Sequence, residues 1–275
     1  MVDKRVFHKS ILDWYRVHKR SLPWRNDTTP NPYHIWLSEI MLQQTRVVTV
    51  LDYFNHFTAR WKTLEALAKA DEQEVLTAWA GLGYYSRARN LIKCAKEIMA
   101  HHGGKIPDTI EELEALPGIG KYTAAAIAAI AYGKPTTPID GNIERIMARV
   151  YAITTPLPKA KKELWQKAQD ISPKKKSGEW AQALMDMGTI ICTPKTPKCP
   201  LCPIENHCQA QKQNLANKLP IRSPRKKKPT RYTTAYVIEN HKGELLLEKR
   251  KEKGLLGGMT GFPTTEWQEK KSPQP

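Results

Sequence analysis

The chain has 275 residues, which is enough for one large domain or two medium ones. It carries 44 Lys and Arg residues against 27 Asp and Glu, and its formal net charge is +17. This excess favours a polyanionic partner, with nucleic acid ahead of a membrane surface. The N-terminus leads into an amphipathic stretch, and no run reaches the roughly 18 apolar residues that span a membrane. We therefore expect a soluble intracellular protein in a reducing compartment, without membrane contacts.

Helical periodicity dominates the chain up to residue 191, and no strand pattern precedes residue 232. The segment 122–132 is rich in alanine and apolar almost all round, which indicates a central buried helix. Cys94 stands alone in a helical pattern and is expected in the core. The body is therefore predicted to be all-α. The expected helices are 6–18, 33–45, 47–57, 63–69, 72–79, 86–101, 110–116, 122–132, 142–151, 161–171 and 180–191.

Four of the five cysteines lie in a window of 17 residues, separated by six, two and five residues. Disulfide frameworks belong to short secreted chains, and zinc usually takes two well-separated Cys-x2-Cys pairs, whereas only one such pair is present. Four thiolates in one loop, with prolines that keep its backbone extended, suit a [4Fe–4S] cluster. The predicted ligands are Cys192, Cys199, Cys202 and Cys208.

This spacing resembles the cluster loop of the endonuclease III and MutY family of DNA glycosylases, and the resemblance extends over residues 1–263. It implies an all-α catalytic body with an endonuclease III-like six-helix barrel at about 21–136. A [4Fe–4S] cluster domain would be made from residues 1–20 plus 137–220. The target base would lie between these two parts.

Residues 116–124, Leu-Pro-Gly-Ile-Gly-Lys-Tyr-Thr-Ala, join two helical stretches. Glycines allow a tight turn and close backbone approach, and the amide groups at the start of the next helix can bind a phosphate. The segment resembles the helix-hairpin-helix motif that grips DNA without reading its sequence. An ordinary corner between two helices is the alternative interpretation. Gly118, Gly120 and Lys121 are the candidate DNA contacts of this motif.

Two carboxylates are the candidate catalytic pair. The helical neighbours of Glu39 are mostly apolar, so desolvation should raise its pKa. Asp140 precedes a helical period, and a helix N-terminus should favour its charged form. The alternatives are a surface glutamate at the border of the core and a plain helix cap. The resemblance to the MutY branch implies that Glu39 is the general acid and that Asp140, 20 residues after Gly120, is the catalytic aspartate.

The same resemblance assigns further site residues. Tyr122 and Asn142 are expected to orient Asp140 and the attacking water. Endonuclease III-like members carry a catalytic lysine at the position of Tyr122, and Lys121 lies one place earlier, so no Schiff base is expected. The base must leave the duplex stack to reach such a site. The residues expected to fill or probe the gap in the duplex, or otherwise to bind DNA, are Gln44, Thr45, Tyr84, Arg25 and Arg46.

The composition changes at residues 221–231, where cations and prolines predict a basic linker. An extended hairpin pattern follows, with a turn at residues 240–243. The segment 232–275 resembles the start of a Nudix-like domain that recognises 8-oxoguanine, and it stops short of that domain's usual length. One hairpin in so few residues is too little for a stable independent domain.

The resemblance implies a monofunctional enzyme that hydrolyses the N-glycosidic bond of adenine mispaired with 8-oxoguanine, and also with G or C. Its partner would be double-stranded DNA with A:8-oxoG or A:G mispairs. We expect a monomer in the cytoplasm, associated with the nucleoid in a prokaryote. Two alternatives are a bifunctional pyrimidine glycosylase and lyase, and a non-enzymatic iron–sulfur DNA-binding protein.

Overall fold

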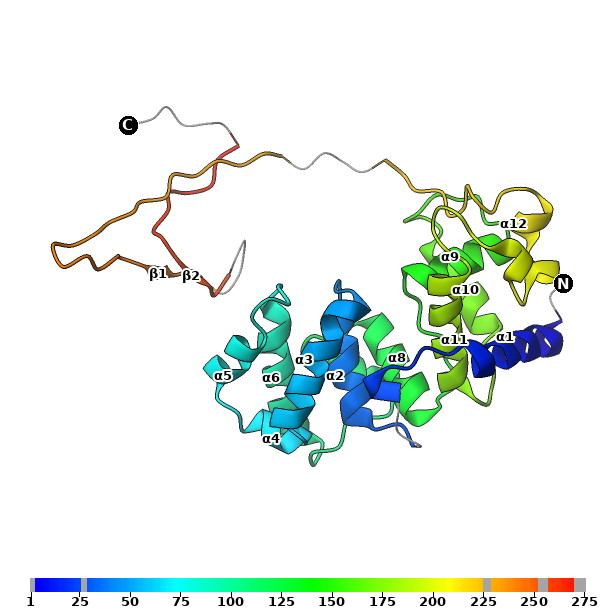
Figure 1. Cartoon of the computed structure of the whole chain (residues 1–275), viewed down its shortest axis with the longest axis horizontal. Coiled ribbons are helices and arrows are strands. Elements are labelled where there is room, and N and C mark those ends of the chain that lie inside the picture. The colour runs from blue at the N-terminus through cyan, green and yellow to red at the C-terminus, as the bar shows by residue number, and fades with distance from the viewer. Residues whose placement is uncertain (1–2, 26–28, 225–228, 252–256, 270–275) are drawn as a thin grey trace. The chain divides into compact units, whose positions relative to one another are not determined.

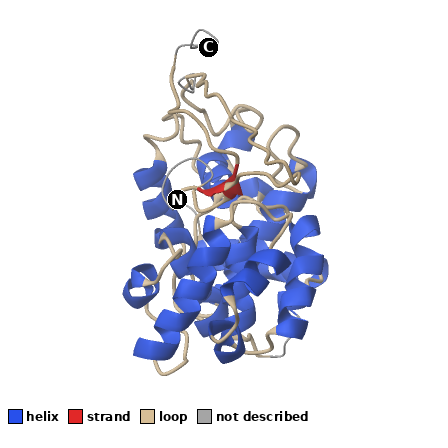
Figure 2. Ribbon diagram, turned by 90° about the vertical axis from the view of Figure 1, so that its left-hand side faces the viewer, coloured by secondary structure: helices blue, strands red, loops and turns tan. Residues whose placement is uncertain are grey.

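The computed structural model describes residues 3–25, 29–224, 229–251 and 257–269. The chain divides into two compact units, residues 1–223 and 224–275. The first unit is helical, and Figure 2 shows helices throughout its body. None of the helices in the described ranges is long and apolar enough to cross a membrane. The α-helices are α1 Lys4–His18, α2 Pro32–Leu42, α3 Val47–Arg60, α4 Leu64–Ala68, α5 Glu72–Ala78, α6 Ser86–His101, α7 Ile110–Ala115, α8 Lys121–Tyr132, α9 Gly141–Val150, α10 Lys161–Asp170, α11 Ser177–Ile190 and α12 Gln209–Lys212.

Helix α8 is the central helix of the first unit, as its alanine-rich sequence predicts. It packs against α2, α7 and α11, and its residues from Thr123 to Ile130 are almost all buried. In Figure 1, α2 to α6 lie on one side of α8, whereas α1 and α9 to α12 lie on the other. The helical body is therefore built as two groups of helices that meet at α8.

Helix α11 approaches its neighbours closely at two glycines. A Cβ atom on Gly178 would lie 3.0 Å from the carbonyl oxygen of Ala129 in α8. A Cβ atom on Gly188 would lie 2.6 Å from the Cβ of Asn142 in α9. Both distances are too short for a larger residue, so these glycines set how near α11 lies to the helices that carry the predicted catalytic residues.

The predicted helix 33–45 ends earlier in the structure. Helix α2 stops at Leu42, and Gln43 to Arg46 form a turn before α3. Gln44 adopts a left-handed backbone conformation, with φ of 58°. The Cβ atom of a non-glycine residue disfavours this conformation. The local sequence therefore gives little sign of the turn. Cys94 is fully buried in α6, as predicted.

The second unit has little regular structure in its described residues. Strand β1, Glu248–Lys249, pairs antiparallel with β2, Thr260–Gly261. The predicted hairpin turn forms, because the amide of Asn240 donates to the carbonyl of Glu244 at 3.0 Å. Next to the turn, the extended hairpin pattern appears in the structure as an isolated bridge between Glu239 and Leu245. Much of the apolar surface of this unit is exposed, including Val237 at 66%.

Candidate active site

A cavity of about 940 Å³ in the first unit brings together most of the predicted catalytic and DNA-binding residues. It is lined by side chains from η1 (Pro23–Arg25), α2, the turn after α2, and helices α8, α9 and α11. They come from three parts of the sequence, residues 20–47, 122–161 and 182–189, which are brought together by the packing of α2 and α11 on α8 and of α11 on α9. The predicted residues that line it are Arg25, Glu39, Gln44, Thr45, Arg46, Tyr122, Asp140 and Asn142.

Glu39 is a buried carboxyl at this cavity. Helix α2 starts at an Asn31 cap and is apolar on nearly every side, so the Glu39 side chain is only 6% exposed. The pKa of Glu39 is raised from 4.5 to about 7: burial is the main cause and the charge of Asp140 contributes in the same direction, whereas a Tyr122 hydrogen bond and Arg25 act in the opposite direction. Its Oε2 atom is buried and has no hydrogen-bond partner among the described residues. The carboxyl thus has one buried oxygen whose hydrogen-bonding capacity is unused among the described residues.

Asp140 is the N-cap of α9. Its Oδ1 accepts from the backbone amides of Asn142 at 2.9 Å and Ile143 at 2.8 Å, and its Oδ2 accepts from the Asn142 side-chain amide at 2.9 Å. Burial nevertheless raises the pKa of Asp140, and these hydrogen bonds offset only part of that effect. The helix terminus favours the charged form of Asp140 through these amides, whereas desolvation acts in the opposite direction and is the larger effect.

Tyr122 and Asn142 contact the two carboxylates separately. Tyr122 is at the second position of α8, and its hydroxyl is hydrogen-bonded to Glu39. Burial raises the pKa of Tyr122 well above 10, so the hydroxyl keeps its proton. Asn142 is hydrogen-bonded to Asp140, and its Oδ1 accepts from Arg145 at 2.9 Å. Tyr122 thus contacts Glu39, and its expected role in orienting Asp140 stays a prediction.

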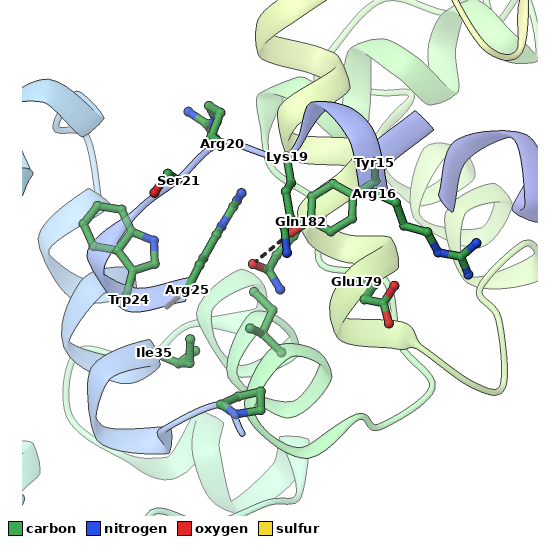
Figure 3. A pocket seen from close by; sticks show the side chains of 12 residues that line it. Tyr15, Arg16, Lys19, Arg20, Ser21, Trp24, Arg25, Ile35, Glu179 and Gln182 are labelled. Carbon is green, nitrogen blue, oxygen red and sulfur yellow. Dashed lines mark hydrogen bonds between the residues drawn. The ribbon is translucent and has the colours of Figure 1, made fainter. Parts of the chain in front are cut away.

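The sequence analysis missed a buried ion cluster beside the cavity. Asp186 of α11 is fully buried and accepts from Arg20 Nε at 2.6 Å and Arg25 Nη1 at 2.8 Å. An adjoining pocket of about 620 Å³ lies beside these arginines, and in Figure 3 Tyr15 and Gln182 face Arg25 across it. The sequence does hint at this cluster: Asp186 lies between Met185 and Met187 in an apolar helical stretch, which suggests a buried charge.

The predicted hairpin joins α7 to α8. Gly118 has φ of 79°, and a Cβ atom there would lie 2.9 Å from the Cβ of Asn90, so this position requires glycine. Gly120 is the N-cap of α8, and Lys121 is exposed at its first position. Tyr84 is 62% exposed in the turn before α6. These four residues do not line the Glu39 cavity; they lie on the hairpin and on that turn.

The four clustered cysteines converge on a second, much smaller cavity. Cys192, Cys199, Cys202 and Cys208 line a space of about 30 Å³ together with Arg149, whose Nη1 donates to the Cys192 sulfur at 3.2 Å. In the described part of the chain, no three His, Cys, Asp or Glu side chains are grouped closely enough to hold a single metal ion. Arg145 also donates to the Cys192 carbonyl at 2.7 Å, which joins this loop to α9.

Comparison with known proteins identifies the family. Residues 37–173 match the HhH-GPD superfamily of base excision DNA repair proteins. The adenine DNA glycosylase of Homo sapiens is 36% identical over 96% of this chain and 58% of its own length. That of Buchnera aphidicola subsp. Baizongia pistaciae is 38% identical over 94% of this chain and 73% of its own length. The chain thus spans little more than half of its human relative.

Two solved structures show the same fold. A thermostable thymine-DNA glycosylase superposes with a TM-score of 0.68 at 30% identity, covering 76% of this chain and 97% of that one. An endonuclease III in a non-covalent DNA complex superposes with a TM-score of 0.63 at 20% identity, covering 78% of this chain and 99% of that one. With its helical body and its α7–α8 hairpin, the chain belongs to the adenine DNA glycosylase family of the HhH-GPD superfamily.

Proposed function

We propose that this protein is a monofunctional DNA glycosylase of base excision repair. Its substrate would be adenine mispaired with 8-oxoguanine, and also with G or C, and the N-glycosidic bond would be hydrolysed. The observation that carries the proposal is the pairing of two unlike carboxylates in one cavity. Glu39 has a raised pKa and an unpartnered oxygen, whereas Asp140 is held by three hydrogen bonds.

Glu39 acts as the general acid in this proposal. Adenine leaves deoxyribose slowly unless a ring nitrogen is protonated, so a proton donor must lie beside the extruded base. A carboxyl with a pKa of about 7 is substantially protonated at neutral pH and can still give up its proton. Glu39 lines the cavity and its buried Oε2 has no partner among the described residues, so we propose that this carboxyl protonates N7 of the base. Tyr122 fixes the carboxyl through its hydroxyl.

Asp140 acts on the sugar. As the base departs, positive charge develops on the deoxyribose ring, and a carboxylate can stabilise it or trap it covalently. The two backbone amides and the Asn142 side chain stabilise the charged form of Asp140 and fix its orientation. Asn142 is fixed in turn by Arg145. The two carboxylates therefore differ in their hydrogen bonding: three donors stabilise the charged form of Asp140, whereas Oε2 of Glu39 has no donor in the described part of the chain.

The cavity supports hydrolysis without a Schiff base. Tyr122 lines the cavity at the position where endonuclease III-like members carry lysine, and Lys121 is exposed at the start of α8. Lys161 does line the cavity, but its amine lies 3.8 Å from Glu144. This arrangement argues against the bifunctional alternative.

Duplex DNA is the proposed partner. The net charge of +17 supplies attraction to phosphates, and the amides at the start of α8 are available to bind one. Gln44, Thr45 and Tyr84 are proposed to enter the space that the extruded base leaves, with Arg25 and Arg46 as further contacts. The segment 232–275 is proposed to be the start of a Nudix-like domain that recognises 8-oxoguanine.

A [4Fe–4S] cluster is the proposed cofactor. The residues fit it in two respects: four thiols from one loop face the same cavity, and Arg149 adds a positive charge beside Cys192. When bound, the cluster would supply four iron–thiolate bonds that hold the 192–208 loop together. In the proposed reaction the protein supplies the acid and the carboxylate, a water molecule supplies the hydroxyl that ends on the sugar, and no step involves the cluster.

The test is single-turnover base release from A:8-oxoG, A:G and A:C duplexes, measured side by side with a duplex that carries a damaged pyrimidine. We expect adenine release from the mispairs and none from the pyrimidine substrate. Borohydride trapping should give no covalent adduct with DNA. Release of the pyrimidine together with a trapped adduct would favour the bifunctional alternative. Tight binding without any base release would favour a non-enzymatic DNA-binding protein.

A further inference from the structure

Arg87, in the first turn of α6, is a buried arginine bonded to neutral oxygens. Its side chain is 7% exposed, and no ion pair includes it in the part of the chain that the structure describes. A buried charge is costly unless other groups compensate it, so its partners are informative. Its guanidinium donates to the carbonyls of Ile40, Met41, Leu82 and Gly83 and to the hydroxyl of Thr45.

One side of the guanidinium caps helix α2. Nη1 donates to the carbonyl of Met41 at 2.7 Å and to that of Ile40 at 3.2 Å. Both carbonyls belong to the last turn of α2, where the helix dipole is negative; the Ile40 carbonyl also accepts from the Gln43 amide at 3.3 Å. Arg87 therefore fixes the end of the helix that carries Glu39.

The other side holds the turn before α6. Nη2 donates to the carbonyls of Leu82 at 3.0 Å and Gly83 at 3.2 Å, directly before Tyr84. The guanidinium carbon lies 5.6 Å from the centre of the Tyr84 ring, within the range of a cation–π interaction. The same Nη2 donates to Thr45 Oγ1 at 3.0 Å, so one group joins this turn to the turn after α2.

Both turns carry an exposed residue in a strained conformation. Gln44 has φ of 58° and Tyr84 has φ of 49°, and both side chains are exposed. Residues other than glycine keep a left-handed conformation only when the surrounding contacts impose it. Each of these two residues adjoins an oxygen that Arg87 binds, on Thr45 and on Gly83.

We propose that Arg87 is a positioning residue that locks the turns 43–46 and 81–85 together, so that Gln44 and Tyr84 enter the DNA duplex as one rigid unit. The inference rests on the proposed function, because that function assigns these two side chains to the duplex. Arg87 itself is too buried to contact DNA. Its effect on duplex opening therefore has to pass through the two turns.

The test compares Arg87→Lys with the wild-type protein. Lysine keeps the charge but cannot form the planar fork that bonds both turns at once. Opening is followed by the fluorescence of 2-aminopurine placed beside the mispaired adenine, together with duplex affinity. Losing the fork's charged hydrogen bonds should weaken mispair affinity about tenfold and reduce the fluorescence change. The control is Arg60→Lys, which alters another arginine on an aromatic ring, away from the cavity, and should leave both readouts unchanged.

A second background separates positioning from a general loss of structure. In a protein that already carries Gln44→Ala and Tyr84→Ala, the two side chains that would enter the duplex are absent. There, Arg87→Lys should weaken duplex affinity by less than about twofold. The same tenfold loss of duplex affinity in both backgrounds would overturn the proposal, because Arg87 would then act independently of Gln44 and Tyr84. Normal opening by Arg87→Lys alone would also overturn it.

Should Arg87→Lys fail to fold, Thr45→Val removes the single hydrogen bond that joins the two turns through this side chain. Amide hydrogen exchange should then speed up in both 43–46 and 81–85, whereas faster exchange in 43–46 alone would refute the coupling.

None of these readouts needs base release. A wild-type protein that opens the duplex but releases no adenine would refute the proposed function and leave this inference standing. A wild-type protein that neither binds nor opens the duplex would overturn both.

Discussion

Glu39→Gln should stabilise the protein at neutral pH while it abolishes adenine release. The glutamine side chain has nearly the same shape as the protonated carboxyl, but it has no proton to give to the base. Glu39 is buried with one oxygen unpartnered, so ionising it in the folded protein is costly. The substitution removes that cost together with the catalytic proton.

The sign and size of the effect follow from the pKa of Glu39, which folding raises from 4.5 to about 7. Below the lower value, Glu39 is protonated in the folded and the unfolded chain, and ionisation costs no stability. As the pH rises, the unfolded chain releases the proton first, so wild-type stability falls until the pH passes about 7. A shift of this size amounts to about 3 kcal/mol, of which about 2 kcal/mol develops between roughly pH 5.5 and 8.5.

Urea unfolding across that pH range measures the difference in stability between Glu39→Gln and the wild-type protein, with oxygen excluded to protect the proposed cluster. The free energy of unfolding of Glu39→Gln minus that of the wild type should increase with pH and level off above about 8. Glu114→Gln, which changes an exposed carboxylate on α7, is the matched control and should show a flat difference. A flat difference for Glu39→Gln would refute the reasoning, because Glu39 would then titrate like a solvated carboxylate. Adenine release at the wild-type rate would remove Glu39 from the proposed mechanism.

Asp140→Asn should slow single-turnover adenine release by roughly a hundredfold or more, because an amide cannot offset charge on the sugar; unchanged release would leave Asp140 as a helix cap only. Cys199→Ser should lose visible cluster absorbance and yield poorly soluble protein, since little else holds the 192–208 loop. A colourless active wild type with one bound zinc would contradict the cluster assignment. Duplex affinity should fall by about tenfold or more between 50 and 200 mM salt, and a flat response would contradict phosphate binding.

Local patterns predicted much of the helical body. The alanine-rich segment that became α8 is apolar on nearly every side, and only a central position can bury all of it. Glu39 could be placed against an apolar face because helical neighbours are fixed by a period of 3.6 residues. The order of residues along one helix was enough for these predictions, since they need no knowledge of what packs against it.

Contacts between distant segments could not be predicted in the same way. Arg87 bonds carbonyls more than 40 residues earlier in the chain, and carbonyls carry no signature of the side chain that will bind them. Asp186 likewise meets Arg20 and Arg25 from more than 160 positions away. The predicted end of the 33–45 helix failed for this reason, because the left-handed turn at Gln44 depends on tertiary contacts.

The two carboxylates differ in environment because they occupy different positions in their helices. Glu39 lies inside α2, where backbone amides are already bonded along the helix, so no main-chain donor is left for its buried oxygen. Asp140 lies before the first turn of α9, where the amides of Asn142 and Ile143 have no helical partner and bond the carboxylate instead. A carboxyl in a helix interior is thus biased toward its neutral form, and one at an N-cap toward its charged form. Packing α2 and α9 around α8 and α11 brings both carboxylates to one cavity, where the proposed mechanism uses Glu39 as the acid for the base and Asp140 as the anion for the sugar.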